Sequence, residues 1–179
     1  MILAYSGIKG SFSEEAAIAY DPNAELLPAL DMDGTLEAVN QGTADLGIFP
    51  VTNSTGGLVE TAYEAMGRHD FQLVDKLPFE VNQCLLALPN TKPEDIKKIA
   101  SHPQALTQCK NYLSKTFPNA ELVEWSDTAT AARDLKEKSI AVLAPAQSAK
   151  EYGLEILAEK VQDEHPNITT FIIIKPTTS

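Results

Sequence analysis

The segment LGIFPVTNSTGG, residues 46–57, decides the predicted fold. Its first five residues are mainly apolar, which favours a buried strand. Polar residues and glycines follow, and Leu58-Val59 then begins a helical pattern of apolar side chains. The segment is therefore predicted to be a strand, a loop and the start of a helix. Such a loop is either a plain turn or a binding loop, because the first N–H groups of a helix lack intrahelical partners.

Strand-like and helix-like segments alternate on both sides of this segment. A Ser-x-x-Glu capping pattern at residues 11–14 begins a helix that runs to Tyr20. Helical spacing recurs around residues 32–39, 58–66, 106–113 and 128–135. The other expected strands are residues 2–5, 25–27, 71–77, 83–88, 98–101, 122–125, 140–143 and 170–174. This alternation is typical of α/β proteins with mostly parallel sheets flanked by helices.

The alternating segments form two series, which predicts two lobes. Residues 1–78 together with 166–179 form lobe 1, and residues 79–165 form lobe 2. Two connections between the lobes would leave a ligand cleft between them, and clefts of this kind are common ligand sites.

Composition excludes several classes of protein. The 179 residues carry a net charge of −11 and only two arginines, which argues against a nucleic-acid partner. Cys84 and Cys109 lie in apolar patterns without metal-type spacing, so we expect reduced core cysteines in a cytoplasmic protein. No apolar run is long enough to span a membrane, and no His or carboxylate cluster has metal-ligand spacing.

Four predicted loops join a strand to a helix, at residues 6–11, 52–57, 101–104 and 126–128. In open α/β sheets, ligands bind at the carboxyl ends of strands, where these loops lie. Helix N-termini there suit a small anion. His102 is an acid–base candidate or a structural residue at a helix start. These features predict a binding cleft but do not separate an enzyme from a binding protein.

Taken together, the loops resemble a known family. SHPQALTQC at residues 101–109 resembles the S-H-P-Q-A-L-x-Q-C segment of prephenate dehydratases. Similar matches are GIKGSFSE at 7–14, PVTNSTGG at 50–57, YGLEIL at 152–157, Asp163, and NITTF at 167–171. Order and spacing agree over essentially the whole chain.

The resemblance implies a fold like the type II periplasmic binding proteins, with both lobes forming one catalytic domain. It also implies an enzyme, a lyase that converts prephenate to phenylpyruvate, water and carbon dioxide in phenylalanine biosynthesis. That reaction uses no metal and no organic cofactor, and the expected partner is a small dicarboxylate. The resemblance further implies an oligomer, and a homodimer is expected. Most members continue into an ACT domain that binds phenylalanine; the sequence stops soon after residue 174, so feedback control by that route is not expected.

Matched position by position, the resemblance implies specific roles. Thr169 would hydrogen-bond the departing hydroxyl of the substrate. The other implied catalytic residues are Asn53, Ser101 and Gln108, and the implied substrate-binding residues are Ser11, Phe12, Thr52, Ser54, His102, Thr170 and Phe171.

Two departures from the family pattern bear on activity. Thr52 stands where the family has glutamate, and Thr170 stands where it has arginine. One account makes that acid and base structural partners whose joint loss is tolerated. In the other, the arginine grips a substrate carboxylate, which threonine cannot imitate. The alternatives to a dehydratase are therefore a non-catalytic or altered-specificity homologue that binds a small carboxylate, and a prephenate decarboxylase that does not aromatise the ring.

Overall fold

The computed structural model describes residues 1–177, which form two compact units. Unit 1 comprises Met1–Ile8, Phe12–Glu80 and the chain from Ile168 onwards; unit 2 comprises Lys9–Ser11 and Val81–Asn167. The chain passes from unit 1 to unit 2 after Glu80 and returns at Ile168, in each case two residues later than the sequence predicts. The short segment Lys9–Ser11 also groups with unit 2. Residues 178–179 of the expected lobe 1 lie outside the described residues.

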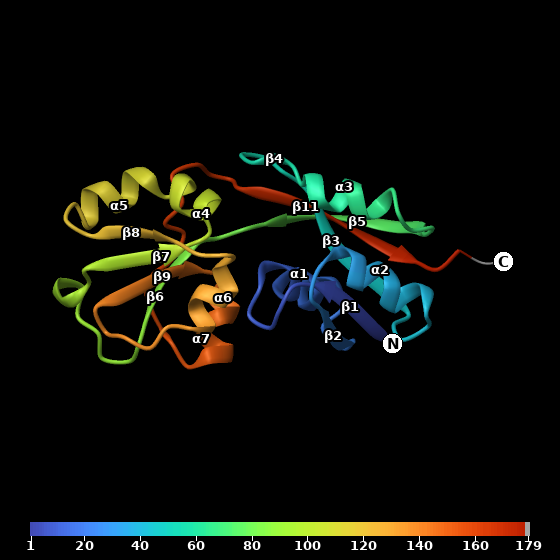
Figure 1. Cartoon of the computed structure of the whole chain (residues 1–179), viewed down its shortest axis with the longest axis horizontal. Coiled ribbons are helices and arrows are strands. Elements are labelled where there is room, and N and C mark those ends of the chain that lie inside the picture. The colour runs from blue at the N-terminus through green and yellow to red at the C-terminus, as the bar shows by residue number, and fades with distance from the viewer. Residues whose placement is uncertain (178–179) are drawn as a thin grey trace. The chain divides into compact units, whose positions relative to one another are not determined.

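Unit 1 is built on a six-stranded sheet with the order β2-β1-β3-β11-β5, with the short β4 paired to β3 (Figure 1). Its elements are β1 (Ile2–Ser6), α1 (Phe12–Tyr20), β2 (Glu25–Ala29), α2 (Met32–Asn40), β3 (Leu46–Asn53), β4 (Gly57–Leu58), α3 (Glu60–Met66), β5 (Gln72–Glu80) and β11 (Ile168–Lys175).

The sheet of unit 1 is mixed, whereas the sequence predicts a mostly parallel one. β1 runs parallel to β2 and to β3, as expected for strands joined by helices. β11 lies antiparallel between β3 and β5. The reason is connectivity: β5 leads out of unit 1 and β11 leads back in, so the two neighbours run in opposite directions.

Unit 2 is built on a second mixed sheet, with the order β10-β6-β9-β7-β8. β7 is parallel to β8 and β9, whereas β6 is antiparallel to β9 and β10. Its elements are β6 (Cys84–Ala87), a 3-10 helix (Pro93–Asp95), β7 (Lys98–Ser101), α4 (Pro103–Gln108), α5 (Lys110–Thr116), β8 (Glu121–Glu124), α6 (Thr128–Arg133), β9 (Ile140–Ala144), α7 (Ala146–Tyr152) and β10 (Glu155–Ala158).

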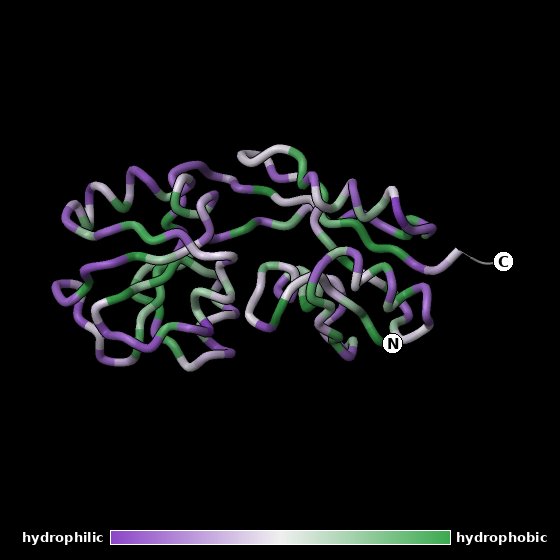
Figure 2. The backbone as a smooth tube through the Cα atoms, in the orientation of Figure 1, coloured by the Kyte–Doolittle hydropathy of each residue, from purple (hydrophilic) through white to green (hydrophobic). Residues whose placement is uncertain are grey.

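Apolar side chains of unit 1 pack on both faces of its sheet. Along β11, Phe171 and Ile173 join one core cluster, and Ile172 and Ile174 join the other. This division follows from the two-residue period of a strand. A strand buried on both faces has a continuous apolar sequence rather than an alternating one, and Figure 2 shows this hydrophobic run along the C-terminal half of β11.

β5 forms one edge of the first sheet. Two of its residues reduce the number of backbone N–H groups that are left without a partner along that edge. Pro78 has no N–H group, and the carboxylate of Asp75 accepts a hydrogen bond of 2.7 Å from the backbone N–H of Lys76. Prolines and charged side chains are common protections against pairing with another chain.

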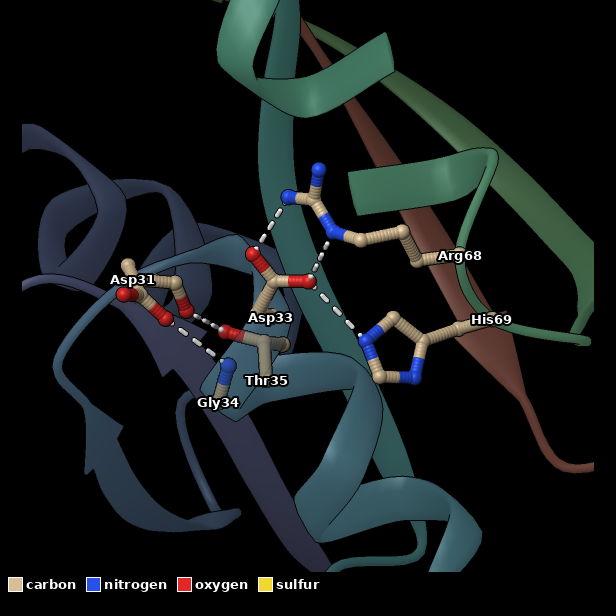
Figure 3. Close-up of polar contacts among 6 residues, drawn as sticks. All are labelled: Asp31, Asp33, Gly34, Thr35, Arg68 and His69. Carbon is tan, nitrogen blue, oxygen red and sulfur yellow. Dashed lines mark hydrogen bonds and ion pairs between the residues drawn. The ribbon is translucent and has the colours of Figure 1, made fainter. Parts of the chain in front are cut away.

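An ion-pair cluster joins the start of α2 to the loop after α3 (Figure 3). The carboxylate of Asp33 accepts hydrogen bonds from Arg68 Nε at 3.0 Å and from a terminal Arg68 nitrogen at 2.6 Å, and it lies 2.9 Å from His69 Nε2. The hydrogen bond from Arg68 lowers the pKa of Asp33. Beside it, Asp31 caps α2 by accepting from Gly34 N at 2.8 Å.

No helix among residues 1–177 is long and apolar enough to cross a membrane.

Gly47 allows α2 to pack closely on β3. A Cβ atom at this position would lie 2.9 Å from Thr35 Cγ2 and 3.0 Å from Val39 Cγ2, both on stiff β-branched side chains. We expect Gly47→Ala to destabilise the fold by about 1–3 kcal/mol in urea denaturation followed by circular dichroism. Gly67→Ala is the matched control, because its new Cβ would meet no atom closer than 3.5 Å. Equal stability of the two variants would contradict this packing account.

Cys109 predicts a pH dependence of stability. Burial, together with the nearby charge of Asp163, raises the pKa of its thiol to about 12. Above pH 9 the thiol of the unfolded chain ionises while the buried thiol keeps its proton, so stability must fall as pH rises towards 12. We expect unfolding free energy, measured from pH 8 to 10, to fall more steeply for the wild type than for Cys109→Ala. Parallel pH profiles would show that the thiol does not contribute.

Candidate active site

The segment after β3 is a hairpin rather than the predicted entry to a helix. β3 pairs antiparallel with β4 through Thr52 opposite Leu58 and Asn53 opposite Gly57, and α3 begins only at Glu60. The Asn53 side chain stabilises the turn: its Oδ1 accepts from Thr55 N at 3.0 Å, Thr55 Oγ1 at 2.8 Å and Gly56 N at 2.8 Å. This local bonding competes with a helix start and favours a turn.

The same amide holds the hydroxyl of Thr169. Asn53 Nδ2 donates to Thr169 Oγ1 at 2.9 Å, and Thr169 is only 8% exposed. Because Asn53 Oδ1 accepts from three donors, the orientation of the amide is fixed. A threonine hydroxyl can accept and donate at the same time. Thr169 therefore accepts from Asn53 and can direct its own proton to another acceptor.

The ladder between β3 and β11 places the site residues in register. Thr169 pairs with Asn53 and Thr170 with Thr52, after which the register shifts so that Phe171 faces Pro50. Directly paired residues lie on the same face of a sheet. The two departures from the family pattern, Thr52 and Thr170, are therefore cross-strand neighbours.

Three expected substrate contacts of unit 1 differ in their surroundings. Ser54 is exposed, but its Oγ accepts from Ile168 N at 2.9 Å and its N–H donates to Ile168 O at 2.8 Å. Phe171 is 1% exposed and packs edge-on to Phe79, with ring centroids 6.2 Å apart, and its expected substrate contact stays a prediction. Phe12 begins α1 and is partly buried.

In unit 2, Ser101 and His102 make structural contacts at the end of β7. Ser101 is fully buried, and its hydroxyl donates to Leu143 O at 2.7 Å, which ties β7 to β9. The catalytic contact expected for Ser101 stays a prediction. His102 Nδ1 accepts from Gln104 N at 3.2 Å and caps α4, which agrees with the structural alternative for this residue.

Gln108 belongs to a second polar group, which the sequence predicts only in part. Its Oε1 accepts from Asn167 Nδ2 at 3.3 Å, and its backbone oxygen accepts from Asp163 N at 2.7 Å. The Asp163 carboxylate also accepts from the N–H groups of Asn111 and Tyr112 at the start of α5. Asp163 and Asn167 both belong to the family motifs, and the motifs do not indicate these partners.

The first loop is held by α7 within unit 2. Ser148 Oγ donates to Gly10 O at 2.7 Å, and Tyr152 Oη donates to Lys9 O at 2.5 Å. Gly10 has a φ of +82°, and a Cβ there would lie 3.0 Å from Ser148 Cα, so glycine is required for this approach. Ser11, an expected substrate contact, follows Gly10 and is partly buried.

The groups that unit 1 brings together around Asn53 and Thr169 are uncharged hydroxyls and amides. They can donate and accept hydrogen bonds around a polar ligand without carrying a net charge of their own. Within residues 1–177, no three His, Cys, Asp or Glu side chains gather as a candidate metal site.

Comparison with known proteins identifies the family. The family model for prephenate dehydratase matches residues 3–179. Arogenate dehydratase/prephenate dehydratase 1 of Arabidopsis thaliana is 37% identical over 175 residues, covering 96% of this chain and 44% of the relative. The chain thus spans less than half the length of this curated relative.

Solved structures agree on the fold. A prephenate dehydratase from Arthrobacter aurescens in complex with L-Phe matches with a TM-score of 0.91 and 28% identity, covering 100% of this chain and 61% of that one. A protein described as the quorum quenching acylase GqqA matches equally, with a TM-score of 0.91, 28% identity and coverage of 100% and 65%. A periplasmic substrate-binding protein of Coxiella burnetii, 16% identical over 98% of this chain and 85% of its own, has a TM-score of 0.51 and shows the fold alone.

These matches confirm the predicted two-lobe fold of the periplasmic-binding-protein type. The matching family model covers nearly the whole chain, and a relative that is 37% identical covers 96% of it. This chain belongs to the prephenate dehydratase family.

Proposed function

We propose that this chain catalyses the dehydration and decarboxylation of prephenate to phenylpyruvate, water and carbon dioxide. The observation that carries the proposal is the hydrogen bond of 2.9 Å from Asn53 to the Thr169 hydroxyl. Family membership gives the reaction class. The bond from Asn53 orients the Thr169 hydroxyl, because it fixes the side on which the oxygen accepts and leaves the proton to donate.

The reaction needs a hydrogen-bond donor at the leaving oxygen. The bond between the ring and the departing carboxylate breaks, and its electron pair moves through the ring as carbon dioxide leaves. The ring hydroxyl is then expelled and takes up a proton to leave as water. Negative charge develops on that oxygen in the transition state, where a positioned donor has its largest effect. We assign this donation to Thr169.

Arogenate is the second substrate to test. It carries the same ring and leaving hydroxyl but has an amino group where prephenate has a keto group, so Thr169 would serve both. The Arabidopsis relative is named for both activities. The decisive measurement is release of phenylpyruvate or phenylalanine from each substrate by the purified chain. Binding without turnover would instead support the non-catalytic homologue, and a non-aromatic product would support the decarboxylase.

The pairing of Thr52 with Thr170 favours the structural account of the two family departures. Residues that face each other across a ladder interact directly, so an acid and a base at these positions would compensate one another. Replacing both by threonine leaves no unpaired charge between the two strands. We therefore propose that the exchange preserves the site.

The proposal extends to location and assembly. Both cysteines are buried and not joined to each other by a disulfide within residues 1–177, which supports a reducing compartment such as the cytoplasm. The proposed homodimer rests on the family resemblance alone.

The role of Thr169 predicts a large loss of turnover in one variant. We expect Thr169→Ala to lower kcat about 100-fold to 1,000-fold, the usual cost of removing one transition-state donor. Thr169→Ser should keep most of the activity because it retains the hydroxyl. Thr43→Ala, at an exposed position after α2, is the matched control. A wild-type rate in folded Thr169→Ala would exclude this role.

The cross-strand account predicts coupling between positions 52 and 170. We expect the double variant, Thr52→Glu with Thr170→Arg, to be more stable than the sum of the two single effects on unfolding free energy predicts. The expected coupling, measured by urea denaturation of all four proteins, is about 0.5–1 kcal/mol in the stabilising direction. Additive effects of the two substitutions would favour the account in which arginine acts on the substrate.

A further inference from the structure

Ser54 makes an unusual pair of bonds with Ile168, the residue before Thr169. Its backbone N–H donates to Ile168 O at 2.8 Å, as in an ordinary ladder. The return bond, from Ile168 N at 2.9 Å, goes to the Ser54 side-chain hydroxyl. In a regular antiparallel pair, the backbone carbonyl would accept that bond.

The hairpin explains why a side chain takes this place. Asn53 is the last residue of β3, and residues 54–56 turn towards β4. The turn ends the regular ladder with β11 after the pair formed by Asn53 and Thr169. The Ser54 hydroxyl thus extends the pairing by one residue beyond the end of the strand.

These bonds hold the backbone on the N-terminal side of Thr169. Ile168 O belongs to the peptide group that links Ile168 to Thr169, and Ile168 N belongs to the preceding peptide group. Fixing both groups fixes the direction in which β11 presents Thr169. The neighbouring Asn53 fixes the Thr169 hydroxyl itself.

We propose that Ser54 is a positioning residue for Thr169, acting through the backbone of Ile168 rather than by contact with the substrate. The inference rests on the proposed function for its effect on catalysis. It replaces the substrate-binding role expected for Ser54 from the family resemblance.

The proposal predicts which kinetic constant changes. Ser54→Ala removes the acceptor for Ile168 N–H, so Thr169 is less well oriented when the leaving group departs. We expect kcat to fall about tenfold, the size of one lost hydrogen bond, with KM within twofold of the wild type. Ser54→Thr keeps an oxygen on Cβ and should restore kcat to within about threefold of the wild type. Ser114→Ala is the control, because Ser114 is an exposed serine whose hydroxyl donates to a backbone oxygen in α5.

A double-variant cycle tests whether Ser54 acts through Thr169. In the Thr169→Ala background, Ser54→Ala should lower the remaining kcat by less than twofold, because the group being positioned is gone. An unchanged kcat in Ser54→Ala, a rise in KM alone, or a full tenfold loss in both backgrounds would each overturn the inference. Thermal melts of every variant identify a loss of fold.

Amide hydrogen exchange gives a readout that does not depend on turnover. We expect the Ile168 amide to exchange at least tenfold faster in Ser54→Ala than in the wild type and Ser54→Thr. Equal exchange rates would overturn the anchoring role. If the wild type turns over neither prephenate nor arogenate, the proposed function fails and the catalytic part of this inference fails with it. The exchange rates still decide whether the hydroxyl holds the strand.

Discussion

The insertion of β11 between β3 and β5 is the constraint on which unit 1 depends. β11 comes from the far end of the chain and pairs along eight residues with β5 and along most of its length with β3. Its apolar residues fill both core clusters of the unit. Without this strand, β3 would have no partner on the side away from β1, and β5 would not join the sheet.

The same strand carries Thr169, the proposed hydrogen-bond donor. Thr169 lies where β11 enters the sheet, opposite the last residue of β3, so the ladder that completes the core also delivers the hydroxyl to Asn53. The hairpin after Asn53 provides acceptors and donors without ionised groups. A threonine hydroxyl donates a hydrogen bond as a neutral group, and aromatisation of the product supplies the driving force of the proposed reaction.

Much of the architecture could be predicted from local patterns, because buried strands and amphipathic helices have different periods. Strand direction could not, since it depends on where the chain leaves and re-enters each unit. β4 has only two residues, too few for any period. The motifs contain Asn53 and Thr169, which the structure joins by a hydrogen bond. The motifs do not indicate that the Ser101 hydroxyl donates to the backbone oxygen of Leu143, forty-two positions away in the sequence. They also do not indicate that Phe171 belongs to the core.

The order of the strands also bears on how the protein forms during synthesis. A ribosome makes β3 and β5 long before β11, so the first sheet stays incomplete while the whole of the inserted segment 81–167 emerges. That segment contains every strand of the second sheet and can collapse first. The sheet of unit 1 is completed last, by contacts between residues far apart in the sequence. Such contacts form slowly. Until then the edge of β3 that β11 will cover is open to pairing with another chain.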